Sequence, residues 1–192
     1  MAVPLPIPAP DRAIPHPTDG VLFARSDCAG ISRRIFAGVV DLAVVLLFGA
    51  FWWPVCFLTV PDPGIATSLW VGSVFIAASL YFAGLKRTEL CTVGYRLAGI
   101  RVVGLDGEPP RLWPMFVRFA FCVVWLLTGS TLFLVDLFWI GGDEQRQTIR
   151  DKLAGTVVIR RAAKPVARGR QAVRFYTFVG LSLFCREVKA EP

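Results

Sequence analysis

The sequence is poor in the side chains that most enzymes and metal sites use. Its 192 residues include one histidine, His16, which lies among the prolines near the N-terminus. The five cysteines are scattered and form no CxxC pair, so neither a disulfide framework nor a zinc site is expected. The sequence also contains no phosphate loop and no nucleophile–base motif. We therefore expect a protein that is not an enzyme and that holds no metal and no cofactor.

Charge is missing from long stretches of the chain. Hydrophobic residues make up 55% of the sequence, and the mean hydropathy is +0.57. Residues 35–60 contain a single charged side chain, Asp41, and residues 65–85 contain none. A helix needs about 20 apolar residues to cross a hydrocarbon core of ~30 Å, so both stretches are predicted to be transmembrane helices. A chain this short could not cover two such helices in a soluble core.

A third apolar segment, residues 113–140, is interrupted by Arg118 and Asp136. It is too short for two complete crossings, and Gly129 in its middle tolerates a turn. The segment is therefore either a single span or a re-entrant hairpin. A re-entrant hairpin needs protein around it, because lipid cannot satisfy its backbone hydrogen bonds.

Basic residues set the expected orientation. Arg33 and Arg34 precede the first span and Lys86 and Arg87 follow the second, whereas the linker at 61–64 contains no basic residue. Lysine and arginine collect on the cytoplasmic flanks of membrane helices. Both outer ends of the helical pair, including the N-terminus of the chain, are therefore predicted to be cytoplasmic.

Two segments of the sequence echo each other. Residues 92–103 can be laid over residues 148–159, and each runs through Leu-Ala-Gly into β-branched residues. Such a glycine ends a short helical turn, and β-branched residues favour a strand. We predict strands over 99–103 and 155–160 that pair in a small cytoplasmic β element. This pairing favours return of the third segment and a cytoplasmic C-terminus. The predicted fold class is an all-α polytopic membrane protein with this two-stranded addition.

The two terminal segments are predicted to lie outside a membrane domain of residues 28–161. Residues 1–27 are rich in proline and are expected to be disordered. They lack the apolar core of a signal peptide, so the first span is expected to be an uncleaved anchor. Residues 162–192 form a basic tail with a short apolar stretch. Beside a bilayer, this tail is expected to bind anionic headgroups, and no nucleic-acid motif is present.

Charged residues inside the apolar segments are the candidate functional residues. An ionised carboxylate in lipid costs at least ~2.5–3.5 kcal/mol, so Asp41 needs a partner or a wet cavity. Arg118 would lie at a similar depth, and we predict an ion pair between the two. The pair either clamps the helices or opens to bind a proton or a small cation. Asp136, near the end of the third segment, is interpreted as an interfacial residue.

Three parts of the sequence resemble the RDD family of small bacterial membrane proteins. They are residues 34–41, residues 92–103 with Asp106 and Gly107, and residues 146–158. The family is named for one arginine and two aspartates. The resemblance places them at Arg34, Asp41 and Asp151, with Asp136 as the rival for the last position. It implies a multi-pass protein of the bacterial inner membrane.

Two positions depart from the family pattern. Tyr95 stands where the family often has lysine, and Arg150 stands where it often has histidine. Asp151 lies between Arg150 and Lys152, so the simplest expectation is a salt bridge to one of these neighbours.

Two functions are compatible with the sequence. The first is transport of a small solute, a cation or a proton, which rests on the charges at membrane depth and on the usual suggestion for RDD proteins. Two or three helices cannot enclose a pathway, so transport implies a homo-oligomer. The second function is that of a non-catalytic membrane scaffold or accessory factor, which binds a protein partner. In both cases the lipid bilayer is a partner of the chain.

Overall fold

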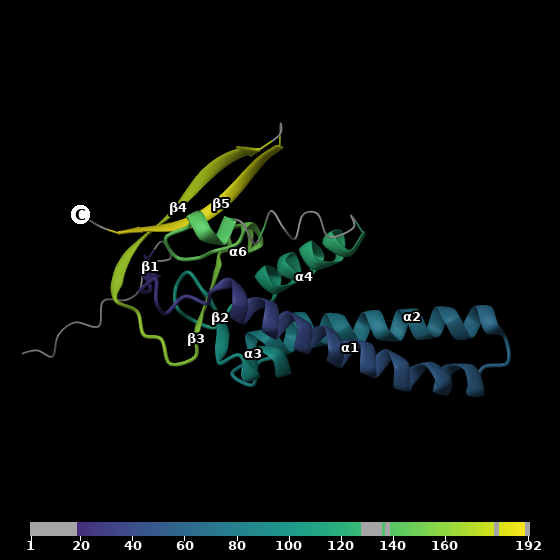
Figure 1. Cartoon of the computed structure of the whole chain (residues 1–192). Coiled ribbons are helices and arrows are strands. Elements are labelled where there is room, and N and C mark those ends of the chain that lie inside the picture. Colours follow the sequence, from purple (N-terminus) through teal and green to yellow (C-terminus); the bar gives the residue numbers. More distant parts are fainter. Residues whose placement is uncertain (1–18, 128–135, 137–138, 179–180, 191–192) are drawn as a thin grey trace, which may run out of the picture.

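Two long helices project from a lobe of strands and short helices in the computed structural model, which describes residues 19–127, 136, 139–178 and 181–190 (Figure 1). Helix α1 spans Ile31–Thr59. Helix α2 spans Pro63–Ser79 and continues through a π-helical turn, η1 (Leu80–Gly84), and a 3-10 turn, η2 (Leu85–Arg87). The two predicted apolar helices are therefore present, and each is long and apolar enough to cross a membrane.

Local sequence signals start α2 and join it to α1. The Asp62 side chain accepts a hydrogen bond from the backbone N of Ile65 at 2.9 Å, and Pro63 occupies the first helical position. Further along, the indole of Trp70 donates to the backbone carbonyl of Gly49 at 2.9 Å. This hydrogen bond joins the middle of α2 to α1.

The two echoed segments form matching turns and pair with each other, as predicted. Helix α3 (Val93–Leu97) leads into strand β2 (Ile100–Gly104), and α6 (Ile149–Ala154) leads into β3 (Thr156–Arg160). Gly99 and Gly155 connect them with φ values of 65° and 61°, a conformation that favours glycine. The strands are antiparallel, with Val102 opposite Val158. The predicted strands at 99–103 and 155–160 are confirmed to within one residue.

Alternate side chains of this two-stranded sheet enter two hydrophobic clusters, as the period of a strand requires. One cluster joins the sheet to the helices and includes Tyr95, Ile100 and Val158. The other lies on the opposite face and includes Phe23 and Val157. The small sheet is thus the middle layer of the molecule.

The outer layer is a second sheet, which the sequence analysis did not predict. Strands β1 (Asp19–Leu22), β4 (Ala167–Phe178) and β5 (Leu181–Ala190) form an antiparallel sheet in the order β1-β4-β5. The β4–β5 ribbon arches over α6 (Figure 1). Together with α3, α6, β2 and β3 this sheet makes up what we call the β lobe.

The second sheet corrects three predictions. The fold is mixed and mostly helical rather than all-α. The predicted tail at 162–192 contains a long hairpin. Part of the segment 1–27, expected to be disordered, forms β1, whereas residues 1–18 lie outside the described residues. In each case strand pairing satisfies backbone groups that a tail would leave to water.

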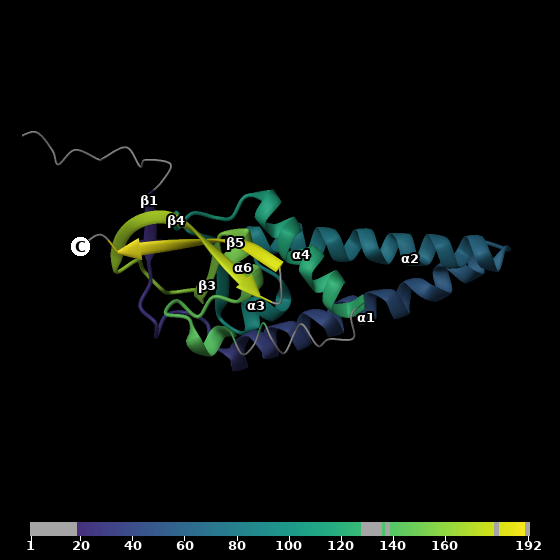
Figure 2. The ribbon, with the colours of Figure 1, turned by 90° about the horizontal axis from the view of Figure 1, so that it is seen from above.

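The third apolar segment begins as α4 (Leu112–Leu127), which lies across the helical pair on the side of the β4–β5 ribbon (Figure 2). The Phe119 ring of α4 stacks on Phe82 in η1, with their centroids 6.1 Å apart. Near the end of the segment, Asp136 accepts a hydrogen bond from the backbone N of Arg150 in α6. Both the start and the end of the segment therefore contact the rest of the molecule near the β lobe. The predicted bend at Gly129 lies outside the described residues.

Candidate functional site

Asp41 is completely buried where α1 meets the start of α3. Its carboxylate accepts three hydrogen bonds, each 2.8 Å long, from the hydroxyls of Tyr81 and Thr92 and from the backbone N of Gly94. The ammonium group of Lys86 lies 3.7 Å from the same carboxylate. These donors replace the water that an ionised acid would otherwise require.

Close backbone contact makes this arrangement possible. A Cβ atom at position 94 would lie 2.0 Å from the carbonyl oxygen of Ala37 and 2.8 Å from a carboxylate oxygen of Asp41. Only glycine therefore lets α3 approach α1 so closely. The π-helical turn η1 contributes Tyr81 from the other side, and such turns are frequent at functional sites. The Thr-Val-Gly sequence at residues 92–94 thus binds the Asp41 carboxylate.

Replacing the Thr92 hydroxyl tests whether residues 92–94 hold Asp41. We expect Thr92→Val to lower the free energy of unfolding by about 2 kcal/mol, because the buried carboxylate loses a hydrogen bond while the shape of the side chain is kept. Thr67→Val is the control, since among the described residues that exposed hydroxyl bonds to the Pro63 carbonyl of its own helix and to no other group. Thermal unfolding in detergent measures both. Equal stability of the two variants would contradict a role for Thr92 in holding Asp41.

Asp151 is the second completely buried carboxylate, and two arginines from distant parts of the chain converge on it. Arg34 of α1 donates to one oxygen at 2.5 Å, and Arg118 of α4 donates to the other. Arg118 also donates to the hydroxyl of Thr156 at 2.7 Å. Asp151 therefore joins α1, α4 and α6, and we call this group the Asp151 cluster.

Hydrogen bonds at the start of α6 also hold Asp151 in place. The Thr148 hydroxyl accepts a hydrogen bond from the backbone N of Asp151, and the Asp151 side chain accepts one from the backbone N of Thr148. This reciprocal capping box starts α6. Arg34 is fixed in turn by donating to the carbonyls of Ala29 at 3.0 Å and Arg146 at 2.7 Å.

The charges of the cluster fix the protonation state of Asp151. Burial alone would raise the pKa of a carboxyl, but the guanidinium groups of Arg118 and Arg34 outweigh it and hold the pKa of Asp151 below its usual range. Asp151 is therefore ionised at physiological pH. Tyr95 lies near the same charges, since the cations of Lys86 and Arg118 outweigh burial and lower the pKa of its phenol.

The predicted ion pair between Asp41 and Arg118 is wrong. Arg118 bonds to Asp151 instead, because α4 packs against α6 at this point. Asp41 is satisfied by the start of α3, and the nearby cation is Lys86. Sequence depth alone could not distinguish these partners.

The expected salt bridge from Asp151 to a sequence neighbour is also wrong. Successive residues of a helix point about 100° apart, so Arg150 and Lys152 leave on other faces of α6. Arg150 lies over the ring of Trp125, 4.6 Å from its centroid. Lys152 binds Glu187 at 2.5 Å and a further carboxylate, that of Asp143, at 2.6 Å.

Asp136 is buried inside the protein, with 2% of its surface exposed, and its carboxylate lies 3.5 Å from the Arg150 guanidinium. Arg34 contacts Asp151, and this pairing supports Asp151 as the second family aspartate. Tyr95, which replaces the family lysine, lies beneath the ammonium group of Lys86, 4.2 Å from its ring centroid. Lys86 thus brings a cation to the surroundings of this position.

The sequence analysis missed several residues that bind Asp41 or belong to the Asp151 cluster. Thr92 and Thr148 each open one of the echoed segments, so their equivalent positions were a usable signal. Tyr81 and Thr156 carried no such signal, because only the tertiary fold brings them to the buried charges. Among the residues that the structure describes, no group of three or more histidine, cysteine or acidic side chains is arranged to hold a metal ion.

The fold and the two buried carboxylates, Asp41 and Asp151, define the class of this small protein. Two helices that could span a membrane are joined to a β lobe by the contacts of these carboxylates. The chain belongs to the RDD family, whose model matches residues 28–155. A distant homologue from Bacillus subtilis (strain 168), the uncharacterized protein YckC, is 29% identical over 133 residues. This similarity covers 68% of the present chain and 83% of YckC. No solved structure matches the chain.

Proposed function

We propose that this chain is a multi-pass protein of the bacterial inner membrane, with α1 and α2 crossing the bilayer and the β lobe in the cytoplasm. The strongest support is the exposure of the two helices. In the described part of the chain, only 17% of the apolar window in α1 and 6% of that in α2 is buried inside the protein. Large side chains such as Leu58, 87% exposed, and Phe51, 77% exposed, would face lipid.

The basic residues support the same orientation. Arg33 donates to the carbonyl of Ala98 and Lys86 lies over the ring of Tyr95, so both are at the end of the helical pair that joins the β lobe. The loop at the opposite end, residues 61–64, contains no basic residue. With the β lobe in the cytoplasm, the pairing of β2 with β3 supports return of the third apolar segment to the cytoplasmic side. We propose that it does so as a re-entrant hairpin, of which α4 is the first arm.

We propose that the activity is that of a non-catalytic scaffold or accessory factor, which holds its β lobe at the membrane surface for a partner. The observation that carries this proposal is the saturation of Asp41 and Asp151 by internal donors. Carboxylates that bind a proton or cation in turn have to exchange partners during each cycle. These two carboxylates instead connect the helices to the lobe, which suits a structural role.

Transport by a homo-oligomer is a second candidate, favoured by one observation. Lys86 lies 3.7 Å from Asp41 at the end of the second predicted span, next to the π-helical turn. This pair is close enough to exchange a proton if water enters from a neighbouring subunit.

Purified protein in liposomes distinguishes the two candidates. We expect proton and sodium flux, followed with entrapped fluorescent indicators, to equal that of empty liposomes for both the native chain and Asp41→Asn. A flux above this background that Asp41→Asn abolishes would overturn the scaffold proposal in favour of transport. An alkaline carbonate wash is the control for insertion, because release of the protein by the wash would contradict the membrane assignment.

A further inference from the structure

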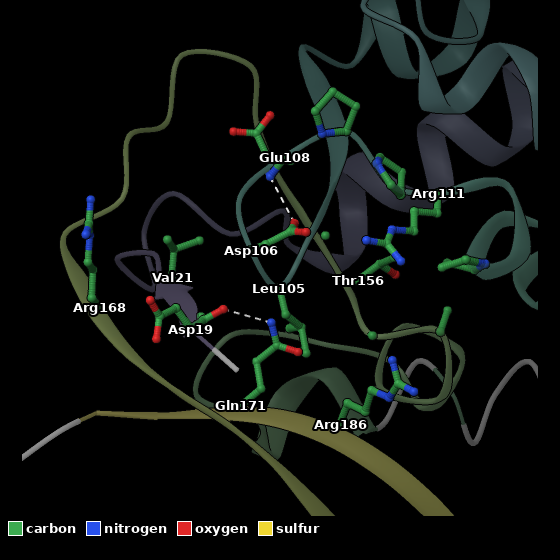
Figure 3. Close-up of a pocket in the computed structure, with 17 residues that line it drawn as sticks. Asp19, Val21, Leu105, Asp106, Glu108, Arg111, Thr156, Arg168, Gln171 and Arg186 are labelled. Atoms are coloured by element: carbon green, nitrogen blue, oxygen red, sulfur yellow. Dashed lines mark hydrogen bonds between the residues drawn. The ribbon is translucent and has the colours of Figure 1, made fainter. Parts of the chain in front are cut away.

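A cavity of about 560 Å³ lies between the outer sheet and the base of α4 (Figure 3). Its volume falls in the range of small-molecule sites, roughly 300–1,000 Å³. Strands β1, β4 and β5 form one side, and the segment 104–111 and the start of β3 form the other. Three residues of the wall, Arg168, Gln171 and Arg186, come from β4 and β5, which lie outside the part of the chain matched by the family.

Three arginines line the cavity, namely Arg111, Arg168 and Arg186. Unlike the arginines of the Asp151 cluster, none of the three has a hydrogen bond or ion pair from its guanidinium group to any residue that the structure describes. Arg111 and Arg186 come from opposite sides of the cavity but lie at the same end of it, the end where Thr156 lies (Figure 3). The stem of Arg186 passes close to Gly155, where a Cβ atom would be 3.4 Å from its Cδ.

The acidic residues of the wall do not neutralise this basic end. Asp106 accepts a hydrogen bond from the backbone N of Glu108 at 3.1 Å, which closes the turn before α4. Asp19 lies opposite Arg170 in the pairing of β1 with β4. The third acid of the wall is Glu108. In Figure 3, Asp19 and Glu108 lie away from Arg186, whereas Asp106 lies between Asp19 and Arg111. The end of the cavity at Arg186 therefore carries positive charge with no acid of the wall beside it.

We propose that this cavity binds a phosphate group, held between Arg111 and Arg186. Guanidinium groups bind phosphate through parallel hydrogen bonds, and two converging from different segments make the site selective for this anion. The floor of the site includes Thr156, whose hydroxyl accepts a hydrogen bond from Arg118. A phosphate bound in the cavity would thus lie next to Thr156, which is hydrogen-bonded to Arg118 of the Asp151 cluster.

The phosphate has two possible sources, which the position of the cavity makes equally accessible. Arg111 directly precedes α4, and the next residues, Leu112 and Trp113, are 48% and 76% exposed. A tryptophan in this position is typical of the membrane interface, where lipid phosphates lie. The inference rests on the proposed membrane location for the lipid source, whereas a water-soluble organic phosphate could enter from the cytoplasm.

Binding is tested on the full chain in a nonionic detergent by isothermal titration calorimetry. The probes are inorganic phosphate, glycerol 3-phosphate and dihexanoyl phosphatidic acid. We expect the native chain to bind a phosphate probe and the double variant Arg111→Gln/Arg186→Gln to bind it at least tenfold more weakly. Arg96→Gln is the matched control, since Arg96 is an exposed arginine outside the cavity and should bind within twofold of the native chain.

The outcomes separate the sources and the proposals. Tighter binding of phosphatidic acid than of the two soluble probes supports a lipid headgroup, and comparable binding of glycerol 3-phosphate supports a soluble phosphate. No binding, or equal loss in Arg96→Gln, overturns the site. Unchanged unfolding temperatures confirm that the variants are folded. The assay involves neither flux nor a bilayer. A failure to bind phosphate would therefore overturn the phosphate site alone, whereas the liposome flux assay tests the scaffold proposal.

Discussion

Replacing Asp151 with asparagine is expected to lower the free energy of unfolding by about 3–5 kcal/mol. The amide has the size of the carboxylate but no charge, so Arg34 and Arg118 would remain buried without their shared anion. The cost is large because the positive charges cannot reach water without separating α1 or α4 from α6. Thermal unfolding in detergent and the amount of protein in the membrane both measure it.

Glu89→Gln is the matched control, because Glu89 is exposed and its side chain contacts no partner among the described residues. We expect that change to stay within about 0.5 kcal/mol of the native chain. If Asp151→Asn were as stable as the control, the Asp151 cluster would not hold the helices to the lobe.

The same residue predicts how stability depends on pH. The pKa of Asp151 is lowered in the folded chain, so its ion pairs contribute fully above the unfolded value of about 4. As the pH falls below about 4, protonation favours the unfolded chain and this contribution is progressively lost. Asp151→Asn should therefore lose less stability than the native chain when the pH is lowered through this range.

Gly94→Ala is expected to destabilise the protein by about 3 kcal/mol or more. The added methyl would lie 2.0 Å from a backbone oxygen of α1, and a backbone atom cannot rotate away as a side chain can. Helix α3 would have to move from α1, which would also lengthen the hydrogen bonds from Thr92 and Gly94 to Asp41. Thermal unfolding and protease resistance of the β lobe report the change.

Gly72→Ala is the control within α2, where an added Cβ would meet nothing within 4 Å. Alanine is the better helix former, so this variant should keep its stability or gain up to about 1 kcal/mol. A Gly94→Ala variant with the stability of Gly72→Ala would show that the contact between α3 and α1 is looser than the structure indicates.

The sequence was sufficient to predict the parts of the fold that repeat a simple pattern. The uncharged runs predicted α1 and α2, and the echo between residues 92–103 and 148–159 predicted both β2 and β3 and their pairing. Arg34 and Asp151 were identified through the family resemblance. These features depend on local composition or on matched segments, which a single sequence displays.

The partners of the buried acids could not be predicted in this way. Asp41 is bonded partly by a backbone N–H, which every residue but proline carries and which therefore leaves no trace in the sequence. The outer sheet was missed for a different reason. Arg168 and Arg170 alternate with Ala167 and Gly169, a strand period that we interpreted as a basic tail because its charge was more conspicuous than its spacing.

The pairing of β1 with β4 has a consequence for biogenesis. One strand emerges from the ribosome before the apolar helices and the other only after them. The outer sheet of the lobe therefore cannot form until synthesis is almost complete. Arg34 likewise has no carboxylate to bind until Asp151, more than a hundred residues downstream, has been synthesised. In the proposed membrane location, insertion of the helices would therefore precede assembly of the lobe. A nascent chain stalled before residue 151 would have Arg34 and Arg118 without the carboxylate that binds them.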